Sequence, residues 1–173
     1  MMRTTRNHFL ILILMSIIGL ISSFTVIYEF YIYHNAPPFC IEQGMKIAGV
    51  PVNCEKVLLA PNGQFIGVPF DFLAALWFII NISLVILVVF AKEKVAKFSF
   101  RSLFLWRFLG ILLVPYLLYL EFFVVKAICI YCTIMHGAIV VDFIIISVMM
   151  FSKKSDIHQS LFGNEGVKKI LKI

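Results

Sequence analysis

Charged residues are scarce in this chain of 173 residues, because Asp, Glu, Lys and Arg together make up only 14% of it. Soluble domains carry roughly 25% charged residues. Hydrophobic residues make up 62% of the chain, and its mean hydropathy is +1.01. A soluble core of this size could not bury so much apolar surface. The composition therefore excludes a soluble globular domain and indicates an integral membrane protein.

Acidic residues are fewer than basic ones, 9 against 15, which gives a net charge of +6. This excess does not indicate nucleic-acid binding, because the basic residues flank apolar runs. No basic stretch is interleaved with aromatic residues, as an RNA-binding module would require. We therefore expect a membrane partner and no nucleic-acid partner.

Apolar runs predict four membrane spans. The first two are expected at about 9–33 and 68–91. One helix over 103–151 would be roughly 70 Å long, over twice the hydrocarbon thickness, so we expect it to fold back near 121–126. This gives two further spans, at about 103–123 and 127–151. The first apolar core is too long for a signal peptide, so we expect a retained anchor.

The basic residues predict the orientation of these spans. Twelve of the fifteen flank the expected inner ends of the spans or lie in the tail. By the positive-inside rule, the N-terminus (1–8) and the tail (152–173) are cytoplasmic, and the loop 34–67 faces outward. Asn53 can cap a short helix beginning at Cys54 on the membrane surface. The predicted fold is an all-α, four-transmembrane-helix bundle whose outer loop contains a short surface helix, in the plasma membrane.

All four cysteines map to the predicted outer face. Cys40 and Cys54 lie in the outer loop, and Cys129 and Cys132 lie at the outer mouth of the fourth span. An even number of cysteines on the oxidising side of a membrane favours disulfide chemistry. One interpretation is a permanent staple between Cys40 and Cys54 plus a passive second disulfide. The other is a relay in which a thiolate of one pair attacks the disulfide of the next.

Cys129 and Cys132 have the spacing of a CxxC motif, and residues i and i+3 share a helix face. A helix N-terminus and the nearby Lys126 would both favour the reactive thiolate. A c-type haem would need His after the second cysteine, where this chain has Thr133. A zinc site would need Cys40 and Cys54 as further ligands. We expect no metal.

Few ionisable residues lie inside the spans. His136 is one helical turn beyond Cys132 on the same face, and we expect it either to contact a substrate or simply to pack. Asp71 at the start of the second span either serves the site or neutralises a helix N-terminus. Glu121 is expected to pair with Lys126. Asp142 needs a buried partner, and Arg107 qualifies only if the inner ends of the last two spans converge.

The arrangement resembles the vitamin K epoxide reductase family in its small microbial form, over roughly 9–151. The resemblance rests on Cys40, on Cys54 with the following residues EKVL, and on Gly67 and Pro69 at the second span. Its strongest part is the segment 119–132, with the sequence YLEFFVVKAICIYC. The order of the pairs, spaced pair first and CxxC at the fourth span, is specific to this family.

The resemblance implies a four-helix bundle around a quinone of the menaquinone or ubiquinone type. It also implies roles for the cysteines. Cys40 accepts electrons from a thioredoxin-like protein, expected here as a separate chain. Cys54 exchanges with Cys129, and Cys132 faces the quinone and forms a charge-transfer or covalent adduct with it.

The sequence departs from the family at several positions. Ala60 replaces a Ser or Thr of the family. Phe70 aligns near an Asn that contacts the quinone oxygen, Asp71 near the neighbouring Ser, and His136 with a Tyr. The expected function is thiol:quinone oxidoreduction that supports disulfide formation outside the cytoplasm. The alternatives are a quinone-epoxide reductase and a non-catalytic, disulfide-stapled membrane protein. The expected site comprises the catalytic residues Cys129, Cys132, Cys54 and Cys40 and the quinone-contacting residues His136, Asp71, Phe70 and Ala60.

Overall fold

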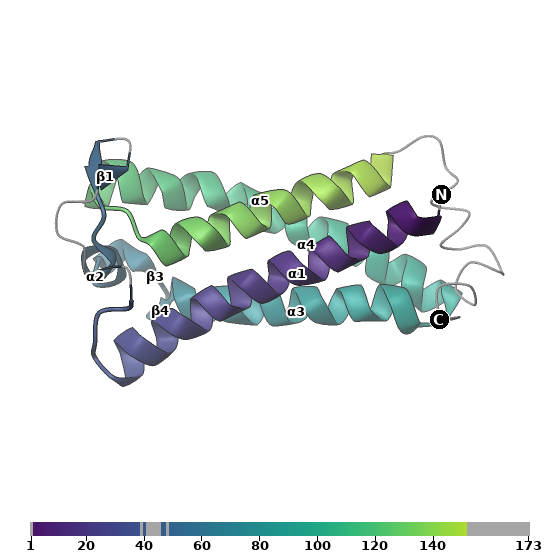
Figure 1. Ribbon diagram of the computed structural model, residues 1–173, viewed down its shortest axis with the longest axis horizontal. Coiled ribbons are helices and arrows are strands. Elements are labelled where there is room, and N and C mark those ends of the chain that lie inside the picture. Colours follow the sequence, from purple (N-terminus) through teal and green to yellow (C-terminus); the bar gives the residue numbers. More distant parts are fainter. Residues whose placement is uncertain (1, 39, 41–45, 48, 152–173) are drawn as a thin grey trace.

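Four long helices run side by side in a bundle (Figure 1). The computed structural model describes residues 2–38, 40, 46–47 and 49–151. The helices are α1 (Met2–Val26), α3 (Phe70–Phe90), α4 (Glu93–Tyr119) and α5 (Ile130–Phe151). Each is long and apolar enough to cross a membrane, the α1 and α4 spans including the turns that follow them. The predicted all-α, four-span membrane fold is confirmed.

Two of these helices end in a π-helical turn at the same end of the bundle. Helix α1 continues into η1 (Ile27–Ile32), and α4 continues into η3 (Leu120–Val125). Lys126 ends η3 in the left-handed conformation, with φ of 52°. Its N–H group and that of Ala127 both donate to the carbonyl of Glu121. These bonds fix the turn after which the chain enters α5.

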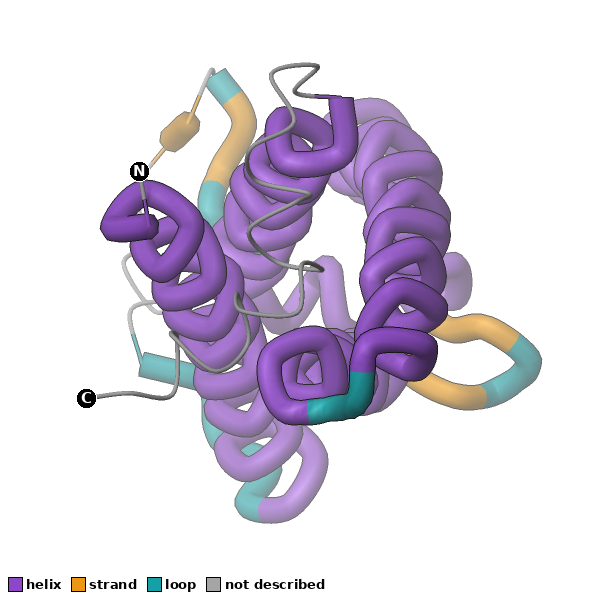
Figure 2. Tube along the Cα trace, turned by 90° about the vertical axis from the view of Figure 1, so that its right-hand side faces the viewer, coloured by secondary structure: helices purple, strands orange, loops and turns teal. Residues whose placement is uncertain are grey.

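Short elements between α1 and α3 cover this end of the bundle. They are β1 (Lys46–Ile47), β2 (Val50–Pro51), α2 (Cys54–Leu58), η2 (Pro61–Gly63), β3 (Gln64–Phe65) and β4 (Val68–Pro69). The strands form two antiparallel hairpins, β1–β2 and β3–β4. Seen end-on, the strands lie outside the ring of helices (Figure 2). The side chain of Asn53 accepts the Lys56 N–H at 2.9 Å, which confirms the expected cap of α2.

Two helices begin earlier than the apolar runs predicted, and the first of them is α1, which begins at Met2 rather than near 9. Helix α4 begins at Glu93, whereas the sequence predicted a third span from about 103. Its first turns carry basic residues, but Ala96, Phe100 and Leu103 follow helical spacing and are buried in the core near the N-terminal end of α1. An apolar stripe therefore extends the helix beyond the uniformly apolar run. The predicted tail at 152–173 lies outside the described residues.

A buried polar network joins all four long helices. Asp142 on α5 lies 3.5 Å from the Arg107 guanidinium on α4. Its carboxylate also accepts hydrogen bonds from Ser16 on α1 at 3.1 Å and from Asn81 on α3 at 3.0 Å. Asn81 in turn accepts one from Arg107 at 3.0 Å. Arg107 is thus the partner that Asp142 required, because α4 and α5 do converge.

Replacing Asp142 with Asn tests this network. The change leaves the Arg107 charge buried without its counter-ion, and breaking a buried pair in this way typically costs about 3–5 kcal/mol. We expect a correspondingly lower free energy of unfolding, measured by denaturant titration in detergent micelles with circular dichroism. The double variant Arg107→Leu/Asp142→Leu removes both charges and should lose less stability. Equal stability of Asp142→Asn and the parent would show that the network does not hold the helices together.

A candidate redox site beside a membrane cavity

Backbone pairing fixes the loop between α1 and α3 against the start of α5. Val52 forms an isolated parallel bridge with Ile128. The Ile128 N–H donates to the Pro51 carbonyl at 3.0 Å, and the Asn53 N–H donates to the Ile128 carbonyl at 3.0 Å. Val52 lies two residues before Cys54, the first residue of α2, and Ile128 lies directly before Cys129. The pairing therefore brings the α2 N-terminus and the α5 N-terminus together.

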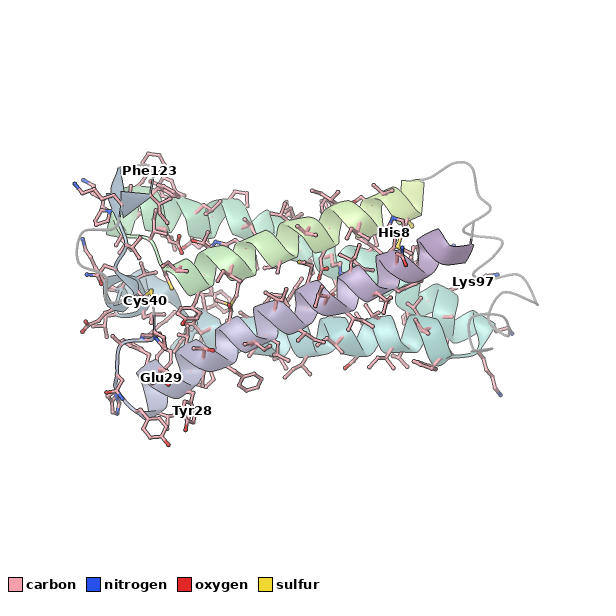
Figure 3. The ribbon with its side chains drawn as sticks, in the orientation of Figure 1. His8, Tyr28, Glu29, Cys40, Lys97 and Phe123 are labelled. Atoms are coloured by element: carbon pink, nitrogen blue, oxygen red, sulfur yellow. A yellow bond between two sulfur atoms is a disulfide. The ribbon has the colours of Figure 1, made fainter. Side chains whose placement is uncertain are left out.

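Two of the four cysteines belong to one buried cluster, and the other two pack against it. Cys40 and Cys54 form a disulfide with a Cα–Cα distance of 5.5 Å. Cys54 and Cys129 belong to the same cluster and are fully buried, and Cys40 and Cys132 pack against it, partly exposed. Figure 3 shows Cys40 at the end of the bundle occupied by α2. In this disulfide Cys40 is half-buried.

Cys129 and Cys132 are free thiols with different surroundings. Cys129 immediately precedes α5, and its sulfur accepts the Cys132 backbone N–H at 3.4 Å. A helix N-terminus places positive potential at this position. Of the two thiols, only Cys132 lines the cavity described next. The CxxC motif therefore presents one sulfur to the loop disulfide and the other to the cavity.

An apolar cavity of about 440 Å³ lies beneath α2 and among α3, α4 and α5. All four residues proposed from the sequence to contact a quinone line it: Ala60, Phe70, Asp71 and His136. Its walls also carry Trp77, Trp106, Leu113, Leu117 and Met135. Gly110 lets α4 approach Trp77 closely, because a Cβ at this glycine would clash with the indole ring. The volume and apolar lining are typical of a site for a small, mostly apolar molecule.

A few polar groups interrupt this apolar lining. Asp71 accepts a hydrogen bond from the Tyr31 hydroxyl at 3.4 Å. Three buried atoms of lining residues have no partner among the described residues: Trp77 Nε1, Glu121 Oε2 and His136 Nδ1. Buried polar atoms normally find partners. Unpartnered groups from α3, η3 and α5 around one cavity therefore indicate a ligand that carries hydrogen-bonding groups of its own.

Glu121 was not recognised from the sequence as a site residue. Its predicted partner, Lys126, is exposed, whereas Glu121 is buried and lines the cavity. The structure describes both residues and shows no ion pair between them. Helical spacing from the buried residues Gly110 and Val114 would have placed Glu121 on the inward face of α4.

The structure also bears on the metal alternative. Among the described residues, no three His, Cys, Asp or Glu side chains lie close enough together to hold a metal ion. Cys40 and Cys54, the two ligands that a zinc site would need in addition to the CxxC pair, are joined in a disulfide. The described site therefore offers sulfur for exchange chemistry.

Comparison with known proteins gives one match. The family model described as the vitamin K epoxide reductase family matches residues 10–147, which is most of the chain and includes all four cysteines. Neither the curated proteins nor the solved structures yield a match.

Replacing Cys132 with Ser tests the proximity of Cys54 and Cys129. Cys129 is then a lone thiol packed beside the loop disulfide, so its thiolate should attack Cys54 and release Cys40. Mass spectrometry of alkylated, unreduced peptides should find a Cys54–Cys129 disulfide and a free Cys40. In the matched variant Cys129→Ser, the remaining thiol lies at the cavity, and the Cys40–Cys54 disulfide should persist. Persistence of that disulfide in both variants would contradict the proposed contact.

Proposed function

Since the chain belongs to the vitamin K epoxide reductase family, whose members are membrane oxidoreductases, we propose that it is a thiol:quinone oxidoreductase. It passes electrons from a thioredoxin-like protein through two cysteine pairs to a lipid quinone, and so supports disulfide formation outside the cytoplasm. One observation carries this proposal. A disulfide pair packs against a CxxC pair of which only the second sulfur, that of Cys132, reaches an apolar cavity.

Two exchange steps move electrons inward. A dithiol of the partner reduces the Cys40–Cys54 disulfide and becomes a disulfide itself. The Cys54 thiolate then attacks Cys129 when that residue is bonded to Cys132, and Cys132 leaves as a thiolate. Cys40 attacks Cys54, restores the loop disulfide and releases Cys129. The electron pair now resides on the CxxC motif.

A third step delivers this pair to the quinone in the cavity. The Cys129–Cys132 disulfide forms again, and the quinone takes up two electrons and two protons to become a hydroquinone. Negative charge develops on the quinone oxygens in this step, so a donor placed beside them stabilises the transition state. We assign this role mainly to His136, whose buried Nδ1 has no partner among the described residues. Asp71 is a second donor when protonated, and Phe70 and Ala60 form part of the wall.

The same residues favour a quinone over a quinone epoxide as the substrate. The positions that align with the quinone-contacting Asn and Tyr of the family hold Phe70 and His136 in this chain. The cavity of this chain is lined mostly by apolar residues and carries the imidazole of His136. Reduction of a quinone needs a donor at the carbonyl oxygen, which His136 supplies.

The proposal also includes the side of the membrane on which the partner meets the protein. Cys40 is the outermost sulfur of the relay and lies at the end of the bundle opposite His8 and Lys97 (Figure 3). The basic residues of the chain put that opposite end in the cytoplasm. A thioredoxin-like protein therefore meets Cys40 outside the cell. A membrane-impermeant thiol reagent should therefore label reduced Cys40 in intact cells. Labelling that appears only after cell lysis would contradict this orientation.

Quinone reduction by the purified protein tests the function. The electron donor is a reduced thioredoxin-like protein, and the acceptor is a soluble quinone. The parent should form hydroquinone, which is measured as a loss of quinone absorbance. Single replacement of any of the four cysteines with Ser should abolish this turnover, because each carries one step of the relay. Turnover that survives in these variants would show that the cysteines do not carry the electrons.

The variant His136→Phe resolves the last step in the same assay. It keeps an aromatic ring in the cavity wall and removes the donor. Quinone reduction should slow by about a hundredfold or more, as when one such donor is lost in other enzymes. The exchange between Cys54 and Cys129 should keep its parental rate. Parental quinone turnover in this variant would make His136 a packing residue.

A further inference from the structure

A buried carboxyl group lies against the sulfur that faces the cavity. Glu121 is 4% exposed and lines the cavity beside Cys132. Its carboxyl group lies close to the sulfur of Cys132 on the neighbouring helix α5, and the two groups interact electrostatically. Its carboxyl oxygen Oε2 is buried and has no partner among the described residues. One carboxyl group thus connects a reactive sulfur with the space that a substrate would fill.

The backbone holds this carboxyl group in place. Glu121 lies in the π-helical turn η3, and such turns often mark functional sites. Its carbonyl accepts two hydrogen bonds, from the N–H groups of Lys126 and Ala127. These bonds close the turn that leads directly into the CxxC motif. The position of Glu121 relative to Cys132 is therefore set by the same turn that positions the cysteines.

Quinone reduction needs protons as well as electrons. Oxidation of two thiols to a disulfide releases two protons, and a quinone takes up two when it becomes a hydroquinone. The cavity is lined almost entirely by apolar side chains, so bulk water is a poor carrier there. A carboxyl group that touches both the sulfur and the cavity can carry a proton between them.

We propose that Glu121 is the catalytic acid–base residue that carries the Cys132 thiol proton to the quinone. This inference rests on the proposed function. The Cys132 S–H bond breaks, and its proton passes to the Glu121 carboxylate. The electron pair leaves the CxxC motif as the Cys129–Cys132 bond forms, and the quinone gains it. Glu121 returns its proton to one quinone oxygen, the Cys129 thiol supplies the second proton, and the enzyme ends with a disulfide and an ionised Glu121.

Other titratable groups face Cys132, but their contacts differ. Cys129 is the other half of the CxxC motif and is oxidised with it. Asp71 on α3 interacts electrostatically with Cys132, but its carboxylate oxygen is bonded to the Tyr31 hydroxyl on η1. His136 lies one turn further along α5. Among these described groups, Glu121 is the one carboxyl group that lies close to the sulfur at the cavity and has a buried oxygen without a partner.

The kinetic test uses purified full-length protein, reduced beforehand with a chemical dithiol and mixed rapidly with a soluble quinone. Glu121→Gln keeps the shape of the side chain and removes the acid. Hydroquinone formation should slow by about a hundredfold to ten-thousandfold, the usual contribution of acid–base catalysis. The limb of the pH–rate profile that belongs to Glu121 should disappear. Glu121→Asp should restore part of the rate.

Two matched measurements separate catalysis from structure. Glu29→Gln changes a carboxyl group in the other π-helical turn, η1. Glu29 does not line the cavity, so this variant should keep the parental rate. The double variant Cys132→Ser/Glu121→Gln should form the Cys54–Cys129 disulfide as fast as the single variant Cys132→Ser does. Hydroquinone formation at the parental rate in Glu121→Gln would overturn the proposal. An equal slowing of disulfide exchange would also overturn it, because the effect would then be structural.

Infrared difference spectroscopy gives a readout that needs no quinone. Spectra of the protein with the CxxC motif oxidised and then reduced by a dithiol should differ in the carbonyl stretch of a carboxylic acid, since Glu121 gains a proton-sharing thiol as its neighbour. This signal should vanish in Glu121→Gln and shift in Glu121→Asp. An unchanged signal in Glu121→Gln would exclude Glu121 as the proton carrier. If the parent shows the signal yet reduces no quinone, the proposed function fails and the Glu121–Cys132 proton exchange stands.

Discussion

Two backbone hydrogen bonds between the loop that joins α1 to α3 and the chain just before α5 determine how the rest of the site is arranged. They join Pro51 and Asn53 to Ile128, and they bring Cys54 and Cys129 into one buried cluster. The loop itself contains only short elements, and the Tyr131 hydroxyl on α5 attaches it a second time by donating to the Pro38 carbonyl at 2.8 Å. Thiol–disulfide exchange requires access of one sulfur to another. The pairing provides that access while water is kept out.

The lipid environment explains why polar groups in this bundle are few and paired. In hydrocarbon an ionised side chain needs a partner. Arg107 and Asp142 find each other and share Asn81 and Ser16, so each of the four helices contributes one member of the network. Glu121 and His136 keep buried atoms without a described partner, and so do Arg107 and Asp142. The difference is that Glu121 and His136 line the cavity, where a substrate can reach these atoms, whereas Arg107 and Asp142 do not.

Much of this organisation is readable from the sequence, because it depends on local patterns. Long apolar runs predict the helices, Asn53 predicts the start of α2, and the CxxC spacing predicts two sulfurs on one helix face. The bridge between Val52 and Ile128 is not readable, because it is made by backbone atoms that leave no side-chain signature. The sequence predicted an ion pair between Glu121 and Lys126 because the two residues are close in the chain. The position of Glu121 depends instead on which face of α4 and its continuation η3 points inward. The Arg107–Asp142 pair likewise depended on the convergence of two helices.

The central claim is that Cys132 is the sulfur that meets the quinone. The absorption spectrum of the Cys129→Ser protein with bound quinone tests it most directly. With Cys129 removed, Cys132 stays at the cavity wall as an unpaired thiol that cannot pass its electrons on. Its thiolate should then give a charge-transfer band with the quinone, and the Cys132→Ser protein should give none. A band in the Cys132→Ser protein and none in the Cys129→Ser protein would contradict the account.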